Sequence, residues 1–460
     1  MKKSKFYLLT ALVAFTAGTQ ANSLDDIYRL ALENDPQLKA DTAAYQAGQE
    51  NRHLGRANLL PQLNGSASYT ISESDTIYSL ADGLPADGVK ANAGSDVVEW
   101  GISLEQALFD LNAWHTYKRG IALSEQAEAE YSADQQSLIV RVAEAYFNVL
   151  RAVDNLEATL AEEKALEQQL EQTNQRFEVG LTPITDVHDA QAAYDSASAA
   201  TLSARGQLGI SYEALEVLTG QSHDAIAPLS EEFPVVQPTP TDRHSWVEFA
   251  LENNFTLKAA SYNSEAARAS ARGARANHYP TLSANASYRE SYNENERESI
   301  LLDDWDREGY SVGVQLRVPL FSGGRTSSQR RQAYAQSMQA EELFNAQQRN
   351  VIQNTRSLHL SVETGVAQVK ARAQAIISNE SAVRATQSGF EVGTRNLVEV
   401  LLAQRSLYQA RRDYSNALYD YIIQTIRLQE AAGMLTPADI ERIDQYLLES
   451  AVVRRSDYGL

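Results

Sequence analysis

The chain has 460 residues, of which 43% are hydrophobic and 22% charged, a balance that excludes wholesale disorder and a length that allows two or three domains. The formal net charge of −20 argues against a nucleic-acid partner, because phosphate binding needs clustered Lys and Arg. The absence of cysteine excludes disulfides and lipid attachment through an N-terminal cysteine.

The N-terminal segment has the layout of an export signal. Lysines at positions 2, 3 and 5 precede an apolar run over 6–15, and small residues at 19–21 offer a cleavage site. We interpret residues 1–21 as a secretory signal peptide; the alternative is a short buried helix. No later segment has about 18 uninterrupted apolar residues, so we expect entry into a membrane only through a closed β-barrel.

The next segment predicts a helix followed by a β-hairpin. Apolar residues spaced by three and four predict a helix over 23–58, interrupted at Asp35-Pro36 because proline disfavours helix in the residue before it. Alternation of apolar with small polar residues then predicts two strands within about 62–109, joined by a polar loop over 73–96.

A very long helix is predicted after the hairpin. Residues 121–179 contain neither Gly nor Pro, and as a helix they would extend for roughly 90 Å. A heptad seam of apolar residues runs through Val142, Tyr146, Val149, Val153, Leu156 and Leu160. Ala, Ser and Gln cover much of the remaining surface, so a helix of this kind can have two lateral neighbours and contribute to a closed ring.

The second half of the chain repeats this plan. Ala31-Leu-Glu-Asn34 recurs as Ala250-Leu-Glu-Asn253, about 219 positions later, and Pro61 recurs as Pro280. The predicted organisation is repeat 1 (22–220, long helices about 113–219), a proline-rich linker (221–244), repeat 2 (245–433, β-hairpin about 281–321, long helices about 325–433) and a C-terminal equatorial segment with one short helix (434–460). We place the linker and the C-terminal segment outside the helical hairpins.

The four predicted strands require more than one copy of the chain. Each strand has about ten residues, the length that a tilted strand needs to cross a bilayer core. Membrane barrels begin at about eight strands, so four strands must be shared among copies to leave no open edge in lipid. The alternative is a pair of hairpins on the face of a soluble α+β protein.

A ten-residue phrase occurs twice where one long helix ends and the next begins: FEVGLTPITD at 177–186 and FEVGTRNLVE at 390–399. Gly180 and Gly393 suit the left-handed position after a helix end. Thr182-Pro183 predicts an N-cap and a first helical residue, and Asn396 with Glu399 predicts a capping box. Asp186 and Glu399 would then either only stabilise helix N-termini or form a ring of carboxylates in a symmetric oligomer.

These features together resemble the TolC family of outer-membrane efflux proteins, in its branch without a lipid anchor. The resemblance covers almost the whole mature chain and rests on the signal peptide, the duplicated plan, the X-Pro entries to the strands and the repeated FEVG turns, including RFEVGLTPITDV. It implies an α+β, mainly α fold, in which a β-barrel with four strands per chain continues into a long α-helical barrel of coiled-coil hairpins.

The resemblance also implies partners and a function. The chain would form a homotrimer in outer-membrane lipid and extend into the periplasm of a Gram-negative bacterium. It would bind a periplasmic adaptor protein and an inner-membrane transporter of the RND, MFS or ABC class. It would be the exit duct for multidrug efflux, type I protein secretion or both, gated at the periplasmic hairpin tips.

Roles for single residues follow from the same resemblance. Glu399 matches the family's acidic ring, although Leu402 stands where a second acid is often found. Three residues match the positions of the family's closure latch: Arg395, Thr185 and Asp186. Phe390 matches a further latch position, where the type member has a tyrosine. Gly180 and Gly393 match the turn glycines on which the adaptor docks. Asp189 lies three residues after Asp186 on the same helical face and could add to the ring.

The sequence lacks the motifs of common enzymes. There is no P-loop, no serine-nucleophile elbow and no zinc-protease helix, and the seven histidines show no metal-like spacing. We therefore expect no enzyme activity, no cofactor and no metal, and transport energy supplied by partners. The alternative function is a periplasmic coiled-coil scaffold or adhesin without a channel.

Overall fold

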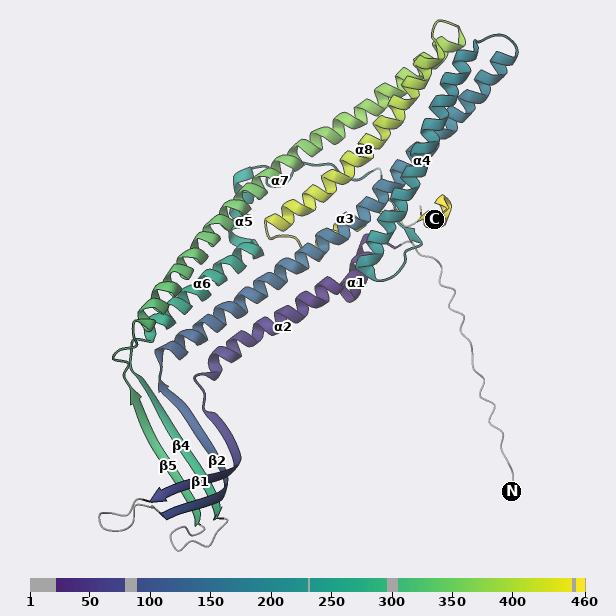
Figure 1. The fold of residues 1–460 in the computed structure, drawn as a ribbon. Coiled ribbons are helices and arrows are strands. Elements are labelled where there is room, and N and C mark those ends of the chain that lie inside the picture. The colour runs from purple at the N-terminus through teal and green to yellow at the C-terminus, as the bar shows by residue number, and fades with distance from the viewer. Residues whose placement is uncertain (1–21, 79–88, 231, 296–304, 449–451, 460) are drawn as a thin grey trace, which may run out of the picture. The chain divides into compact units, whose positions relative to one another are not determined.

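The computed structural model describes residues 22–78, 89–230, 232–295, 305–448 and 452–459 (Figure 1). The predicted signal peptide, 1–21, lies outside the described residues. The elements, in chain order, are α1 (Leu24–Asn34), α2 (Pro36–Ala57), β1 (Gln62–Tyr78), β2 (Val89–Phe109), α3 (Leu111–Glu178), α4 (Ile184–Thr219), β3 (Ala225–Ile226), α5 (Arg243–Asn253), α6 (Phe255–Ala276), β4 (Thr281–Asn295), β5 (Trp305–Arg317), α7 (Arg325–Glu391), α8 (Leu397–Ala431), α9 (Pro437–Asp444), β6 (Val453–Arg454) and the 3-10 helix η1 (Arg455–Tyr458).

The chain forms two compact units, each of which draws on both halves of the sequence. The helical unit comprises Met1–Ala43, Tyr131–Phe255 and Gln348–Leu460, and the sheet unit comprises Ala44–Glu130 and Thr256–Gln347. In the part of the chain that the structure describes, none of the helices combines the length and the apolar character needed to span a bilayer.

The sheet unit is built around four antiparallel strands in the order β1-β2-β4-β5. The two hairpins therefore join through β2 and β4, and within the described residues β1 and β5 each pair on one side only. The register places Ile102 opposite Tyr288 and Tyr288 opposite Tyr310, so these side chains share one face of the sheet. Along the edge strand β5, Tyr310 and Val314 on this face are 85% and 67% exposed.

All four strands are longer than the roughly ten residues predicted for each: β1 has 17 residues, β2 has 21, β4 has 15 and β5 has 13. The polar loop expected over 73–96 is wrong, because β1 and β2 stay paired up to Tyr78 and Val89. The hydrogen bonds between paired strands are made by the backbone, so pairing can extend beyond the segment with an apolar side-chain pattern. The remaining loop residues, 79–88, lie outside the described residues. In the second hairpin β5 ends at Arg317, before the predicted Phe321.

Helices of the sheet unit approach one another closely. A Cβ added to Gly48 of α2 would lie 2.3 Å from the Cβ of Ala127 in α3, so only glycine allows this spacing. Beside it, the Ser124 hydroxyl donates to the Gln49 side chain at 2.7 Å. Arg268 of α6 and Glu341 of α7 are 3.1 Å apart, so each strand hairpin continues into a paired set of helices.

The helical unit holds the main apolar core. Its centre is made of fully buried side chains of α1, α3, α4, α8 and β3, among them Tyr146, Phe147, Tyr212, Leu24, Leu208, Ile226 and Ile422. The predicted heptad seam of α3 lies in this core, with Val142 through Leu156 buried. The predicted break at Asp35-Pro36 is confirmed, since α1 ends at Asn34 and α2 begins at Pro36.

The linker and the C-terminal tail form a small sheet together, which the sequence did not predict. β3 pairs with β6, Leu229 pairs with Leu447, and Asn22 pairs with Ile226. The short helix predicted within 434–460 is present as α9, and the tail also contains β6 and η1, which were not predicted. Such two-residue strands carry no periodicity of their own and exist through partners that are distant in sequence.

Candidate gate at the helical turns

The first FEVG turn connects α3 to α4. Gly180 has φ +74°, as predicted, and its N–H donates to the Phe177 carbonyl at 2.9 Å, while the Leu181 N–H donates to the Arg176 carbonyl at 2.8 Å. The predicted N-cap at Thr182 is wrong. Pro183 precedes the helix in an extended conformation and caps nothing with its side chain, and the Thr182 hydroxyl donates instead to the Asp186 carboxylate at 2.5 Å.

The second FEVG turn connects α7 to α8 and has its own bonding pattern. Gly393 has φ +77°, and the Gly389 carbonyl accepts from the Thr394 N–H at 2.8 Å. Asn396 is the N-cap of α8, and its side-chain oxygen accepts from the Glu399 N–H at 2.9 Å. The predicted capping box is half formed, because the Glu399 carboxylate binds the Arg395 guanidinium, 2.7 Å away, rather than the N-cap backbone.

Two of the predicted latch residues, Arg395 and Asp186, are engaged within their own turns in the single chain. Arg395 and Glu399 lie four residues apart on one helical turn, with side chains 60% and 36% exposed. Asp186 is bonded to Thr182, and Thr185 and Asp189 are exposed. Two of the acids proposed for a ring, Asp186 and Glu399, are thus held by short-range contacts.

One contact joins the two turns and involves a residue that sequence reasoning missed. The guanidinium of Arg176, near the end of α3, lies 4.8 Å from the centroid of the Phe390 ring, near the end of α7. A cation over an aromatic face at this distance is attracted by the negative potential of the ring. Arg176 stands directly before the first FEVG phrase, where the second copy has Gly389, so the difference between the copies was a signal for it.

Further from the turns, α3 and α8 are joined by a ladder of polar contacts, which we call the α3–α8 seam. It consists of the pairs Glu144–Arg427 at 2.6 Å, Arg151–Asp420 at 2.5 Å and Asp154–Tyr419 at 2.8 Å. Burial raises the pKa of Asp154, although hydrogen bonds from Tyr419 and Ser415 oppose the shift. Burial, and next the charge of Glu144, raise the pKa of Glu430, which Arg427 opposes.

Between the seam and the turns the two hairpins enclose a cavity of about 480 Å³. Its walls come from α3, α4 and α8 and include Glu162, Asp189, Leu402, Arg405 and Arg412. Burial raises the pKa of Glu162, and the two arginines oppose the shift. Leu402 contributes an apolar surface here.

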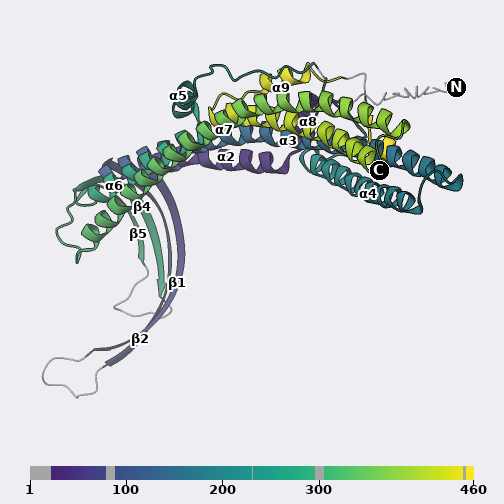
Figure 2. The ribbon, with the colours of Figure 1, turned by 90° about the horizontal axis from the view of Figure 1, so that it is seen from above.

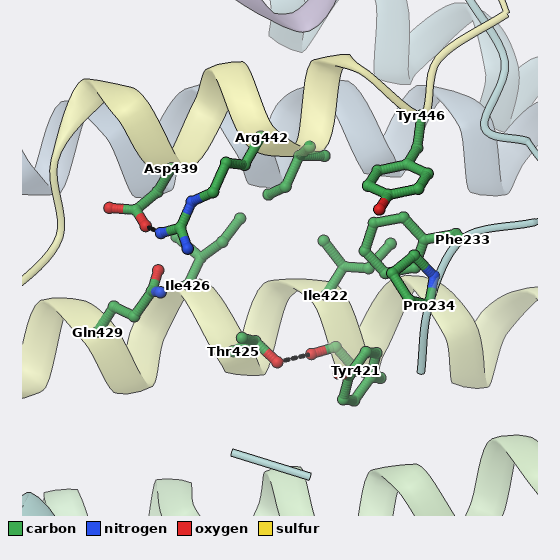
Figure 3. A pocket seen from close by; sticks show the side chains of 11 residues that line it. Phe233, Pro234, Tyr421, Ile422, Thr425, Ile426, Gln429, Asp439, Arg442 and Tyr446 are labelled. Carbon is green, nitrogen blue, oxygen red and sulfur yellow. Dashed lines mark hydrogen bonds and ion pairs between the residues drawn. The ribbon is translucent and has the colours of Figure 1, made fainter. Parts of the chain in front are cut away.

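A second cavity, of about 250 Å³, lies between α8, α9 and the linker (Figure 3). Its walls are mainly apolar, with Phe233, Ile422 and Ile426 facing the space. Polar groups beside it are satisfied inside the chain: Asp439 pairs with Arg442, and the Tyr421 hydroxyl donates to the Val236 carbonyl at 2.8 Å. This cavity lies where the linker and tail pack on α8. The short helix α9 lies beside α8 in Figure 2.

A protein-family comparison matches the chain twice. The model described as "Outer membrane efflux protein" covers residues 27–221 and 246–434. Among curated proteins, the outer membrane protein TolC of Vibrio cholerae is 38% identical over 434 residues, covering 94% of this chain and 96% of the relative. The alkaline protease secretion protein AprF of Pseudomonas aeruginosa is 32% identical over 440 residues, covering 95% and 89%.

Solved structures show the same fold. The chain superposes on the structure of CusC with a TM-score of 0.75, covering 90% of this chain and 92% of CusC at 19% sequence identity. The arrangement of a four-stranded sheet with paired long helices is therefore that of the solved outer-membrane channels.

Proposed function

Because this chain belongs to the outer membrane efflux protein family and is an outer-membrane channel-tunnel, we propose that it works as a homotrimer gated at its paired FEVG turns. The observation that carries the proposal is the placement of both turns in one compact unit, each with a carboxylate in the first turn of the following helix. In a trimer, Asp186 and Glu399 would each occur three times around one axis. Such rings favour cations at a narrow opening.

The trimer itself is supported by the edges of the sheet. β1 and β5 each pair on one side within the described residues, and in lipid an unpaired edge is costly. Pairing β5 of one copy with β1 of the next would satisfy both edges. The number three comes from the resemblance to the TolC family.

The partners follow from the same assignment. We propose that the turns, with Gly180 and Gly393 at their apices, dock a periplasmic adaptor protein, and that an RND, MFS or ABC transporter of the inner membrane supplies energy. The chain itself would have no catalytic activity. Relatives named for protease secretion support protein export as one use, alongside efflux of small molecules.

The duplicated organisation remains a proposal as well. Its repeats, 22–220 and 245–433, correspond closely to the two segments that the family model matches, 27–221 and 246–434. The linker and tail would then be the parts added outside the duplicated plan.

The test of the function is the purified protein itself. Extracted from the outer-membrane fraction, it should migrate as a heat-modifiable trimer and produce single-channel currents in a planar bilayer. A deletion strain should accumulate test drugs. A trimer that assembles but never conducts would instead support the scaffold or adhesin alternative.

A further inference from the structure

Contacts between the two helical hairpins of one chain are distributed unevenly along their length. The α3–α8 seam holds the hairpins together with three charged or charge-assisted pairs at 2.5–2.8 Å. Beyond it, the cavity beside Glu162 separates them, and at the turns Arg176 meets Phe390. The three polar pairs of the seam, the cavity and the Arg176–Phe390 contact therefore follow one another toward the turns.

The weak contact is asymmetric between the two copies of the turn. Arg176 precedes Phe177 in the first copy, and Gly389 precedes Phe390 in the second. A Cβ at Gly389 would lie 2.6 Å from Cγ of Arg395, so the second copy leaves this space to the latch arginine. The first copy has a long cationic side chain at the same position, and that side chain reaches the aromatic ring of the other hairpin.

We propose that Arg176 is a gating residue, which holds the two turns of each chain together by stacking its guanidinium on Phe390. The proposal rests on the gate function proposed above. Because the seam and the cavity lie further from the turns than this contact, breaking it frees the turns to separate without breaking the pairs of the seam. Phe390 would thus act through its ring face, and the tyrosine hydroxyl of the family's type member would be unnecessary.

The first experiment compares single-channel conductance of trimers in planar bilayers. Arg176→Gln and Phe390→Leu should each raise the open-state population, by about two- to fivefold per contact and by about 10- to 100-fold if three contacts open together. Phe390→Tyr should conduct like the parent, because its ring face is retained. The double variant should not exceed the larger single effect. Arg384→Gln is the matched control, because Arg384 lies on α7 near Phe390 but is hydrogen-bonded to Ser381.

The second experiment uses the absence of cysteine in the chain. The double variant Arg176→Cys, Phe390→Cys introduces two thiols. A short cleavable thiol crosslinker should join these two positions within one chain, so the subunit mass on a denaturing gel should stay that of a single chain. Conductance should stay low while the link is intact and rise when it is cleaved. The crosslink holds the two turns together without the Arg176–Phe390 contact. The experiment therefore still tests the proposal if Arg176→Gln assembles poorly.

The outcomes distinguish an error in the role of Arg176 from an error in the proposed function. If the parent conducts and Arg176→Gln behaves like it, with no effect of cleaving the crosslink, the role of Arg176 is wrong and the gate stands. Crosslinks that form only between chains would also overturn it. A parent trimer without any current would instead contradict the proposed function.

Discussion

At the residue scale, the negative charge of Glu399 at the second turn is paired with the positive charge of Arg395. The Arg395 guanidinium is 2.7 Å from Glu399, whose side chain is 36% exposed. A ring of Glu399 residues would therefore be partly neutralised from within each chain. A surface pair of this kind contributes only about 0–1 kcal/mol to stability, so its removal should alter conduction and spare assembly.

Replacing Glu399 with Ala should reduce the cation selectivity of the pore without lowering the yield of trimer. The reason is that the trimer would lose three carboxylates from one narrow cross-section of the pore. Reversal potentials in a salt gradient measure the selectivity, and Glu363→Ala, exposed on α7, is the control. Unchanged selectivity would remove Glu399 from the ring.

Replacing Arg395 or Asp186 with Ala should weaken closure and raise conductance. Arg395→Ala should also increase cation selectivity, because Glu399 loses the cation beside it. Asp195→Ala is matched to the Asp186 change, since Asp195 also accepts from a side chain four residues earlier on the chain. If both variants conduct like the parent, these residues are not part of a latch.

At the scale of elements, protonation bears on stability at Glu430 of α8, whose carboxylate interacts with Glu144 and Arg427, a pair of the α3–α8 seam. The pKa of Glu430 is raised in the folded chain above its usual value of 4.5, first by burial and then by Glu144. The folded chain therefore binds this proton more readily than the unfolded chain. Stability should rise as pH falls from neutral toward 4.5, and the gain is complete below that value.

Glu430→Gln should accordingly raise the melting temperature at neutral pH, by roughly 2 °C, and reduce the further gain on acidification. Melting of the trimer followed by circular dichroism between pH 7 and 5 measures both effects. The exposed Glu363→Gln should change neither. A variant that melts earlier than the parent at pH 7 would show that ionised Glu430 is stabilising in place.

Most elements could be predicted from the sequence because their patterns are long. The heptad seam of α3 and the alternation of β5 are repeated many times, so single exceptions do not hide them. The outer part of the first hairpin was missed because backbone pairing there does not need an apolar pattern. The Arg176–Phe390 contact was missed because it joins positions more than 200 residues apart, and the sequence marks it only by the difference between Arg176 in the first copy and Gly389 in the second.

At the scale of the whole molecule, the exposed face of β5 must be covered in the assembled channel. Tyr310, Val312, Val314 and Leu316 alternate along it and are at least 64% exposed in the single chain. We assign this face to outer-membrane lipid. The residues that alternate with it, including Gly313 and Gln315, lie on the opposite face of the sheet.

Val314→Arg should therefore impair insertion, because an arginine on the lipid face of a membrane strand costs about 2–4 kcal/mol near the bilayer centre. The measurement is the amount of trimer in the outer-membrane fraction. Gln315→Arg places the same side chain one residue along, on the other face, and should insert like the parent. Equal insertion of both variants would contradict the lipid assignment.

The small sheet formed by Asn22, β3 and β6 has a consequence for how the chain acquires its structure. Its two short strands and the bridge at Asn22 come from the beginning, the middle and the end of the described chain, so its backbone pairs close loops of roughly 200 residues each. Contacts of such long range form slowly and only after the intervening chain has been synthesised. The hairpins can fold from local contacts as they emerge, whereas this junction must wait for Val453, which makes the last few residues the step that completes each subunit.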